Sequence, residues 1–460
     1  MMQLSDVVQA LGLSWSGANH TITGVSTDSR AIKPGELFIA LVGERFDAHD
    51  FLDDIAARGA SAAIVSRKTD AAIPQLVVAD TRLALGQLAQ WWRSRFELPV
   101  IGVVGSNGKT TVKEMCAAIL RAEYGDAAVL ATAGNLNNDI GLPLMVLRLN
   151  AGHRVAVLEI GMNHPGETAQ LAPIAAPTVA MINNAQREHQ EFMKSVDAVA
   201  EEHALLLDVL NDEGIAVLNA DDAHAAFWRE RAGQRAVLDF GLGAGVVRGH
   251  FSPAGFGGKL TLQGSWGEIN IDLTVPGDHN ARNACGAAAA CLAAGVSTDA
   301  VARGLNAFRG VKGRLQRRDA PVGVLLIDDT YNANPDSMRA AIDVLAAIPG
   351  RRIFVMGDMG EVGDNAGQMH DEVGGYAKSH GIDRLLCLGD QARAAAANFG
   401  EGGEHFVTLE ALQKALQKEL QPDTTVLVKG SRFMRMERVT DAIAHDAALP
   451  SPNQGKRDAA

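Results

Sequence analysis

Short runs of consecutive apolar residues recur along the chain, separated by turns and by segments with the periodicity of amphipathic helices. Runs of this kind are typical of parallel strands that are buried on both faces and joined by helices. The clearest of them are VIGVVG, AAVLAT, RVAVLEIG, TVAMIN, GIAVLNADD, GVLLIDD, RRIFVMGD, DRLLCLGD and TTVLVKG. The pattern predicts an α/β protein with mostly parallel sheets.

Interruptions of the pattern divide the chain into three domains. The segments GELFIALVG, SAAIVS and QLVVAD predict strands of a small N-terminal α/β domain, residues 1–85, and the helical segment TRLALGQLAQWWRSRF leads out of it. A central domain with a mostly parallel sheet follows at residues 86–311, and the alternation starts again in a C-terminal, Rossmann-like α/β domain at residues 312–448. Residues 449–460 show no periodicity and are expected to be a disordered tail.

One stretch of the central domain has a different pattern. Between residues 235 and 276, KLTLQ and INIDLTV alternate polar with apolar residues on either side of GSWG, as the two arms of a β-hairpin do. We predict an antiparallel appendage here, followed by an Ala-rich helix over residues 280–294 that closes the domain.

Composition narrows the classes of function. The 460 residues carry 42 Lys and Arg against 54 Asp and Glu, a net charge of −12, and such an acidic surface disfavours a nucleic-acid partner. No apolar run approaches the ~20 residues that cross a bilayer, and the N-terminus lacks the basic start of a secretory signal. The four scattered cysteines form no C-x-x-C pair and are expected to be reduced thiols, which fits a cytoplasmic protein without membrane insertion.

The strongest chemical motif is GSNGKTT, which follows a predicted strand and opens a predicted helix. The loop N–H groups and the helix N-terminus would hold phosphate, Lys109 would reach the β- and γ-phosphates, and Thr110 would bind Mg²⁺. The strict P-loop pattern fails, because Val103 stands where its first glycine belongs, and a chance lysine in a glycine-rich turn is the alternative. The flanking strand and helix favour an ATP-binding loop. Its residues are Gly105, Ser106, Asn107, Gly108, Lys109, Thr110 and Thr111.

Two further strand ends carry side chains suited to ATP chemistry. Glu159 ends the run RVAVLE, at the sheet edge where α/β proteins bind ligands, and would hold the Mg²⁺ of the nucleotide; the alternative is a solvent-facing carboxylate. His189 follows another strand and could be a metal ligand, a base, a substrate contact or a satisfied structural histidine. These residues indicate an ATP-using enzyme, and a simple NTPase or a kinase fits them as well.

The C-terminal domain has its own polar strand end in the segment IDDTYNANPDSM. Turn chemistry explains part of it, with Asn and Pro in the turn and Asp336 or Ser337 as the cap of the next helix. It leaves the adjacent carboxylates of Asp328 and Asp329, and Tyr331, without an explanation. We therefore expect a cleft that closes over a second substrate.

With these motifs in view, the chain resembles the Mur ligase family over about residues 20–440. The resembling segments are STDSR, GVVGSNGKTTVKE, GNLNNDIGLPL, EIGMNHPGE, AQREHQEFM, PGDHNARNA, KGR, IDDTYNANPDSM, MGDMGEVG and LVKGSR. The variant P-loop is shared with folylpolyglutamate synthases, whereas REHQEFM and DDTYNANPDSM resemble the members that add D-alanyl-D-alanine.

The resemblance implies a central ATPase domain and an ATP-dependent ligase that uses Mg²⁺, and nothing in the sequence demands more than a monomer. It implies that the enzyme joins D-alanyl-D-alanine to UDP-N-acetylmuramoyl-tripeptide through an acyl phosphate, in the cytoplasmic synthesis of peptidoglycan precursors for the cell wall. A related ligase with another acceptor, a folate or a different muramyl peptide, is the alternative. A nucleotide sensor without activity is disfavoured, because Lys109, Thr110 and Glu159 are all present.

The resemblance also implies roles for single residues, carried over by position. The catalytic residues are Lys109, Glu159 and His189, and the Mg²⁺ ligands are Thr110, Glu159 and, at a second ion, His189. The further ATP contacts are His279, Asn280, Asn283 and Arg314. The uridine nucleotide of the substrate would bind at Thr27, Asp28, Ser29 and Arg30. The dipeptide would bind at Asp329, Tyr331, Asn332 and Asn334.

One position departs from the family. Many members carry a lysine, carbamylated by CO₂, fourteen residues after the metal-binding histidine, and here that position is His203. An imidazole cannot hold a stable carbamate, so the second metal site must differ. We expect His203, a neighbouring acid (Glu201 or Glu202) or water to take the place of the carbamate.

Overall fold

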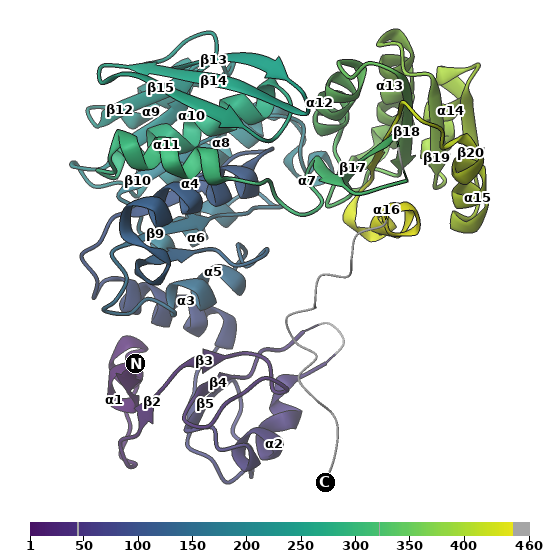
Figure 1. Ribbon diagram of the computed structural model, residues 1–460. Coiled ribbons are helices and arrows are strands. Elements are labelled where there is room, and N and C mark those ends of the chain that lie inside the picture. Colours follow the sequence, from purple (N-terminus) through teal and green to yellow (C-terminus); the bar gives the residue numbers. More distant parts are fainter. Residues whose placement is uncertain (44–45, 322, 445–460) are drawn as a thin grey trace.

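A nine-stranded sheet organises the central domain, drawn in blue to green in Figure 1. This computed structural model describes residues 1–43, 46–321 and 323–444, so the predicted tail at 449–460 lies outside the described residues. The strand order is β15-β14-β13-β12-β11-β10-β7-β9-β8. The strands are β7 (Val100–Val104), β8 (Val129–Ala131), β9 (Val155–Glu159), β10 (Val179–Ile182), β11 (Ile215–Asn219), β12 (Ala236–Gly241), β13 (Val247–Ala254), β14 (Gly257–Gly264) and β15 (Gly267–Leu273).

The sheet is parallel from β8 to β13 and ends in an antiparallel ribbon, β13-β14-β15. The predicted hairpin around GSWG is β14–β15, with Gly264 opposite Gly267. It is not an appendage, as the sequence had suggested, because β13 pairs in parallel with β12 and so continues the main sheet. β13 carries no apolar run, since only its first half alternates buried with exposed residues, and periodicity could not reveal this link.

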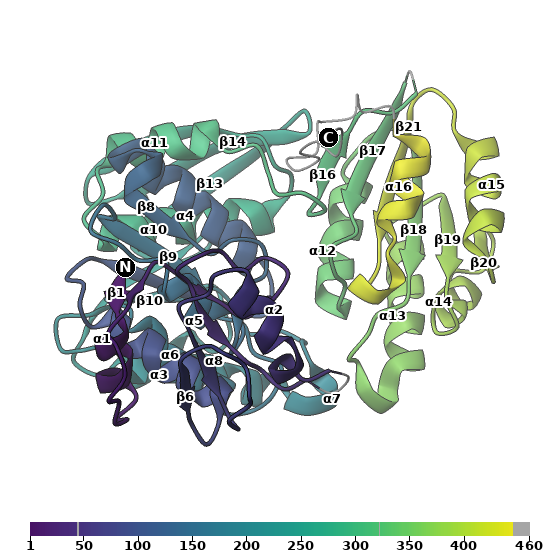
Figure 2. The same cartoon turned by 90° about the horizontal axis from the view of Figure 1, so that it is seen from below.

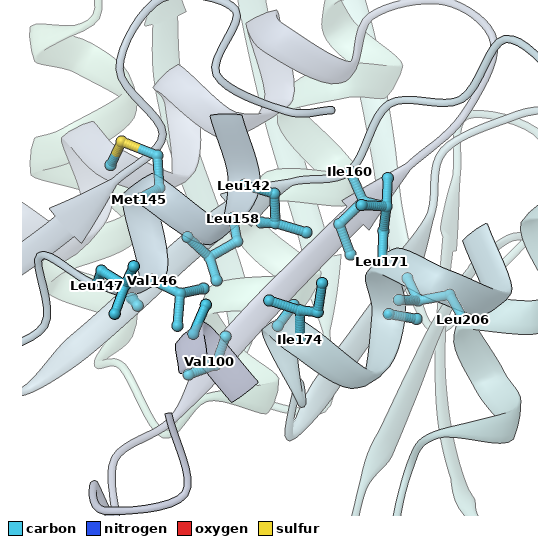
Figure 3. Packing of buried hydrophobic residues seen from close by; sticks show 14 of the residues in the cluster. Val100, Leu142, Met145, Val146, Leu147, Leu158, Ile160, Leu171, Ile174 and Leu206 are labelled. Carbon is cyan, nitrogen blue, oxygen red and sulfur yellow. The ribbon is translucent and has the colours of Figure 1, made fainter. Parts of the chain in front are cut away.

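Helices cover both faces of the central sheet. One face packs against α4 (Lys109–Tyr124), α10 (Asp278–Ala293) and α11 (Thr298–Ala307). The other face packs against α3 (Thr81–Arg93), α5 (Gly141–Val146), α6 (Glu167–Ala175) and α8 (Val196–Asp208), with α9 (Ala225–Ala232) beside α8 and the short η2 (Asp126–Ala128) and α7 (Gln190–Met193) in loops. In this second layer, Leu142, Leu171 and Leu206 of the helices converge on Val100 and Leu158 of the strands (Figure 3).

The C-terminal domain repeats this design around six strands in the order β16-β17-β21-β18-β19-β20. The strands are β16 (Gln316–Arg318), β17 (Val324–Asp329), β18 (Arg351–Gly357), β19 (Arg384–Leu388), β20 (Gly403–Phe406) and β21 (Thr424–Lys429). All pair in parallel except β16, which is antiparallel to β17. The helices and turns are α12 (Pro335–Ala346), η3 (Gly363–Asn365), α13 (Ala366–Ser379) and α14 (Ala392–Phe399) towards one face, and α15 (Leu409–Glu419), η4 (Arg432–Met434) and α16 (Glu437–Ile443) towards the other.

The N-terminal domain is a small parallel sheet, β3-β4-β5-β6, beside a two-stranded ribbon, β1-β2. Its elements are β1 (Met2–Gln3), α1 (Leu4–Ala10), β2 (Thr21–Ile22), β3 (Val25–Ser26), β4 (Leu37–Ile39), η1 (Ala48–Phe51), α2 (Leu52–Ala57), β5 (Ala62–Val65) and β6 (Gln75–Val77). The predicted boundary at 85/86 falls inside α3, a single helix capped by Asp80 that packs on α5 and α6 of the central domain. The boundaries drawn from the sequence stay predictions.

Together these parts confirm the predicted α/β class with three domains. Figure 2 shows the C-terminal domain beside the central one, with α7 and α12 at the side where they meet. Within the described ranges, no helix is both long enough and apolar enough to cross a membrane.

Two glycines of α13 test how tightly the C-terminal domain is packed. A Cβ at Gly374 would lie 2.1 Å from the carbonyl oxygen of Ala395 on α14, whereas a Cβ at Gly367 would meet nothing within 4 Å. We expect Gly374→Ala to lower the free energy of unfolding by about 1–3 kcal/mol, because backbone cannot yield as a side chain can. Gly367→Ala is the matched control and should raise it by about 0.5–1 kcal/mol. Equal midpoints in denaturant-induced unfolding would contradict the contact.

Candidate active site

Loops at the carboxyl ends of both main sheets line a cleft of about 710 Å³ between the central and C-terminal domains. The central wall consists of the glycine-rich loop after β7, the end of β9 and the loop after β10. The opposite wall consists of the loops after β17, β18 and β21. The carboxyl edge of a parallel sheet is where α/β proteins bind ligands, so this cleft is the candidate active site.

The glycine-rich loop joins β7 to α4, as the sequence predicts. Gly108 has a φ of +82°, and a Cβ there would lie 2.6 Å from Oδ1 of Asn283, so only glycine fits. The carbonyl oxygen of Asn107 accepts hydrogen bonds from the side-chain amides of Asn183 (2.8 Å) and Asn184 (2.9 Å). The loop is therefore held in shape by the next strand end without help from a ligand.

Lys109 is the first residue of α4, and its ammonium group turns back onto the loop. Nζ donates to the carbonyl oxygens of Gly105 and Ser106 and, at 3.1 Å, to Oε2 of the buried Glu188. Burial raises the pKa of Glu188, but the charge of Lys109 and two nearby histidines outweigh it and lower the pKa to about 2. A charged pair thus lies where a P-loop lysine meets phosphate, and all three ammonium hydrogens are in use.

Glu159, at the end of β9, is 3% exposed. Its Oε1 accepts a hydrogen bond from the Asn137 amide at 2.7 Å, and its backbone N–H donates to the Thr132 hydroxyl at 2.9 Å. Its Oε2 is buried without a hydrogen-bond partner in the described part of the chain. A buried carboxylate oxygen left unpaired beside a phosphate-binding loop fits a cation ligand, because leaving it unpaired costs free energy.

The donor set suits Mg²⁺ bound together with a nucleotide. Mg²⁺ in such sites takes one or two carboxylates and completes its shell with phosphate oxygens and water. Glu159 and the Thr110 hydroxyl line the same cleft and can supply two oxygens. The described ranges contain no group of three or more His, Cys, Asp or Glu side chains placed to hold a metal on their own.

Arg314, the phosphate contact expected from the third domain, reaches the glycine-rich loop. Nη2 of Arg314 donates to the Thr110 hydroxyl at 2.9 Å, across the boundary between the domains. The guanidinium group also lies over the ring of Tyr331, 4.2 Å from its centroid. Arg314 is thus positioned beside the phosphate-binding loop by an aromatic ring of its own domain.

His189 is held at the opening of α7 with a φ of +46°. Its Nδ1 lies 2.6 Å from Oε2 of Glu361, which comes from the loop after β18, and its Nε2 lies 3.9 Å from Oε2 of Glu188. The contact with His189 lowers the pKa of Glu361. A histidine that engages a carboxylate through one ring nitrogen and turns the other into a cleft has the arrangement of a metal ligand.

The three residues expected to replace the carbamate have separate positions. His203 is buried on α8, with Nε2 at 3.0 Å from Oε1 of Glu188. Glu202 accepts hydrogen bonds from the backbone N–H groups of Gly166 and Thr168 and so holds the start of α6. Glu201 is exposed. Of the three, only His203 contacts the Lys109–Glu188 pair.

A second cavity of about 290 Å³ adjoins the glycine-rich loop and contains the predicted adenine contacts. Burial, with help from the charges of Lys429 and Arg282, lowers the pKa of His279 to about 4, so its ring is neutral near pH 7. Asn280 and Asn283 are almost fully buried beneath the loop. Asn283 accepts from the Asn183 amide at 2.9 Å and therefore supports the loop as well as lining the cavity.

The segment DDTYNANPDSM mixes structural and cleft-facing residues. The buried Asp329 accepts from Lys429 at 2.6 Å and from the backbone N–H of Leu315, and burial raises its pKa against the effect of Lys429. Asn334 caps α12: its side chain accepts a hydrogen bond from the backbone N–H of Ser337, and the Ser337 hydroxyl accepts one from the backbone N–H of Asn334. The predicted cap, Asp336 or Ser337, was therefore wrong by two or three residues.

Asn334 also donates to Oδ1 of Asn107 at 2.9 Å, so both ends of its amide are occupied. Tyr331 and the exposed Asn332 line the cleft. Asp329 and Asn334 are engaged by other residues of the protein. Of the four predicted dipeptide contacts, Tyr331 and Asn332 therefore remain available to a ligand.

The predicted uridine-nucleotide residues lie apart from this cleft. Thr27, Asp28, Ser29 and Arg30 follow β3 of the N-terminal domain and line neither of the two cavities. Asp28 accepts two hydrogen bonds from the Arg30 guanidinium, both at 2.9 Å, and this interaction lowers the pKa of Asp28. A long substrate would have to span from this loop to the phosphate site.

Several cleft residues escaped the sequence analysis. Arg187 binds Asp336 (2.6 Å) and Glu372 (3.1 Å) of the C-terminal domain, and the Asp336 contact raises its pKa. Arg187 and Glu188 stand next to His189 in REHQEFM, and Lys429 stands in LVKGSR. Both motifs stand out in the sequence, but the ion-pair partners of these residues are far away along the chain. The neighbouring residues therefore gave no indication of their roles.

Comparison with known proteins agrees with this geometry. Three family descriptions match successive parts of the chain: "Mur ligase family, catalytic domain" at residues 21–93, "Mur ligase middle domain" at 103–291 and "Mur ligase, glutamate ligase domain" at 313–432. The fold and the cleft define an ATP-dependent amide ligase.

Relatives and solved structures narrow the class. The UDP-N-acetylmuramoyl-tripeptide–D-alanyl-D-alanine ligase of Escherichia coli K12 is 43% identical over 96% of this chain and 98% of its own. A crystal structure of MurF from Acinetobacter baumannii has a TM-score of 0.89 at 37% identity, covering 95% of this chain and 97% of that one. MurF ligase from Thermotoga maritima in complex with ADP has a TM-score of 0.82 at 28% identity, over 91% and 96%. The chain belongs to the Mur ligase family.

Lys109 offers the most direct test of the phosphate site. We expect Lys109→Ala to reduce ATP turnover by at least about 10²–10³-fold, because a cation aimed at developing phosphate charge is lost. Lys259→Ala, which removes an exposed lysine paired with Asp272 on the hairpin, is the control and should leave turnover unchanged. Near-normal phosphate release by a folded Lys109→Ala protein would show that the loop does not hold the reacting phosphates.

Proposed function

We propose that this ligase joins D-alanyl-D-alanine to UDP-N-acetylmuramoyl-tripeptide at the expense of ATP, in peptidoglycan precursor synthesis in the cytoplasm. The observation that carries the proposal is the cleft that combines the glycine-rich loop, Glu159 and His189 with polar loops of a second α/β domain. Relatives that span almost the whole chain carry this activity in their names. A monomer suffices for this reaction, because both walls of the cleft come from one chain.

The reaction has two steps that the site can support. The terminal carboxylate of the tripeptide attacks the γ-phosphorus of ATP, giving an acyl phosphate and ADP. The amine of D-alanyl-D-alanine then adds to the acyl carbon, loses a proton, and phosphate leaves as the amide forms. Lys109 and Arg314 face the charge that develops on the phosphate oxygens. Mg²⁺, held by Thr110 and Glu159, would neutralise phosphate charge when bound.

The adenine end of ATP would occupy the second cavity, against the neutral ring of His279. The uridine nucleotide would lie on the N-terminal domain at the loop of Asp28 and Arg30, which points the tripeptide towards the cleft. Because the two sites belong to different domains, the substrate itself would bridge them. This division explains why a reaction at one carboxylate needs three domains.

The dipeptide would bind to the C-terminal wall, where two further residues supplement Tyr331 and Asn332. Arg432 and Phe433 follow β21 in η4, line the cleft and are both 63% exposed. The preceding Ser431 is buried and donates to the carbonyl oxygen of Ala333 while accepting from the N–H of Gly360. A cation and an aromatic ring on this fixed turn suit the carboxylate and the methyl groups of D-alanyl-D-alanine.

A ligase for folate is the second candidate. Folylpolyglutamate synthase from Mycobacterium tuberculosis has a TM-score of 0.63 at 20% identity, which reflects the fold alone. The much higher identity to the D-alanyl-D-alanine-adding relatives favours the first candidate.

Phosphate release from ATP tests the function. The full-length enzyme should release phosphate only when UDP-N-acetylmuramoyl-tripeptide and D-alanyl-D-alanine are both present, because the acyl phosphate is sheltered until an amine arrives. The matched control replaces the UDP sugar by folate and the dipeptide by glutamate. Release that is indifferent to the dipeptide, or that occurs with the folate pair, would refute the proposal.

Arg432 can be tested with an altered dipeptide. We expect Arg432→Ala to raise the KM for D-alanyl-D-alanine by about tenfold or more, through loss of a charge-assisted hydrogen bond. For the wild-type enzyme, the KM for the dipeptide amide, which lacks the carboxylate, should be as high as the KM of the variant. The variant should have the same KM for the dipeptide and for its amide. Arg393→Ala, an exposed arginine of α14 outside the cleft, is the control. A variant that still prefers the free carboxylate would exclude this contact.

A further inference from the structure

We propose that Glu188 is the protein carboxylate of a second divalent-cation site, where it binds the ion together with His189 while ATP occupies the glycine-rich loop. The inference rests on the proposed function only in taking ATP as the nucleotide. It gives Glu188 the role of replacing the carbamate, which we had expected of His203, Glu201, Glu202 or water.

The polar atoms around Glu188 are buried and incompletely satisfied. Glu188 is 5% exposed and His203 is 1% exposed. Oε1 of Glu188 and Nε2 of His203 lie 3.0 Å apart, yet neither atom has a hydrogen bond of acceptable geometry to any described residue. Buried polar groups in native proteins are almost always hydrogen-bonded, so such a cluster indicates a missing partner at this point of the cleft.

His189 faces the same place. Its Nδ1 lies 2.6 Å from Oε2 of Glu361, an ion-pair contact without hydrogen-bond geometry, and its Nε2 lies 3.9 Å from Oε2 of Glu188. In an octahedral site with ligands at about 2.1 Å, adjacent ligands lie about 3.0 Å apart and opposite ligands about 4.2 Å. The observed separation falls between these values, so one ion can bind both atoms after small side-chain movements. Glu361 would then orient the ligating histidine, as carboxylates commonly do.

Nucleotide binding gives the reason for a cation here. The ammonium group of Lys109 donates hydrogen bonds to Gly105, Ser106 and Glu188, so a phosphate must displace one of these acceptors. If Lys109 turns to the phosphate, Glu188 keeps a buried negative charge beside a second anion, which is strongly unfavourable. A divalent ion bound by Glu188, His189 and a phosphate oxygen would neutralise the two negative charges.

The other carboxylates near His203 cannot take this part. Glu202 accepts hydrogen bonds from the backbone N–H groups at the start of α6, and Glu201 is exposed and is not among the residues that line the cleft. His203 lies beside Glu188 instead, with its Nε2 at 3.0 Å from Oε1. A carboxylate supplied by the chain needs no CO₂, so the site should be independent of bicarbonate.

The test counts bound Mn²⁺, used in place of Mg²⁺, by electron paramagnetic resonance of the full-length protein with the non-hydrolysable analogue β,γ-methylene-ATP. The wild type should bind two Mn²⁺ per chain, with or without bicarbonate. Glu188→Gln should bind one, because an amide oxygen lacks the charge to hold the second ion. Glu191→Gln, which alters an exposed carboxylate three residues along in α7, is the matched control and should bind two.

Two Mn²⁺ of wild-type affinity in Glu188→Gln would overturn the proposal, as would a wild-type count that rises on adding bicarbonate. A weaker affinity for the analogue without loss of an ion would show that Glu188 only positions Lys109, and would overturn it as well. If Glu188→Gln does not fold, Glu188→Asp replaces it. Asp keeps the charge but is shorter, so the second Mn²⁺ should bind at least about tenfold more weakly, and unchanged affinity would refute the assignment. No acceptor substrate is present, so a wrong choice of acceptor cannot affect the count.

Discussion

Each wall of the cleft contains an ion pair between a lysine and a buried carboxylate, near the carboxyl ends of the parallel strands. In the central domain Lys109 pairs with Glu188, and in the C-terminal domain Lys429 pairs with Asp329 at 2.6 Å. Removing one partner of such a pair strands a charge in a poorly solvated place, which costs about 3–5 kcal/mol. Within each domain, the pair therefore holds the segments that carry its two residues in place. Lys429 extends this effect by donating to the carbonyl oxygen of Asn332, which sets the turn before α12.

The two walls meet through polar groups more than through apolar packing. Arg187 binds Asp336 and Glu372, and Asn107 exchanges an amide hydrogen bond with Asn334. These contacts place the glycine-rich loop directly against the helix cap of the other domain. An interface of charges and amides exchanges its partners for water at modest cost, so it permits the domains to separate. Substrates that enter between the walls can thus replace protein partners with their own charges.

How much of this was predictable depends on the separation in sequence. The phosphate loop and Glu159 could be located because strand, turn and helix signals are all local. The strand β13 was missed because its pattern is too weak, and Arg187 was missed because Asp336 lies 149 residues away. Asn334 shows an intermediate case. The sequence predicted a helix cap at this turn but placed it at Asp336 or Ser337, and the contact of Asn334 with Asn107 depends on how two domains dock.

His203 illustrates why a role cannot always be carried over by position. The resemblance to the family led us to expect His203, or its neighbours Glu201 and Glu202, in place of a carbamylated lysine. Helix α8 turns those neighbours in other directions, because successive helix residues point about 100° apart. The carboxylate that does lie within 3.0 Å of His203 belongs to Glu188, from a loop fifteen residues earlier. What the site requires is charge at a point in space, and the chain can supply that charge from any element that reaches the point.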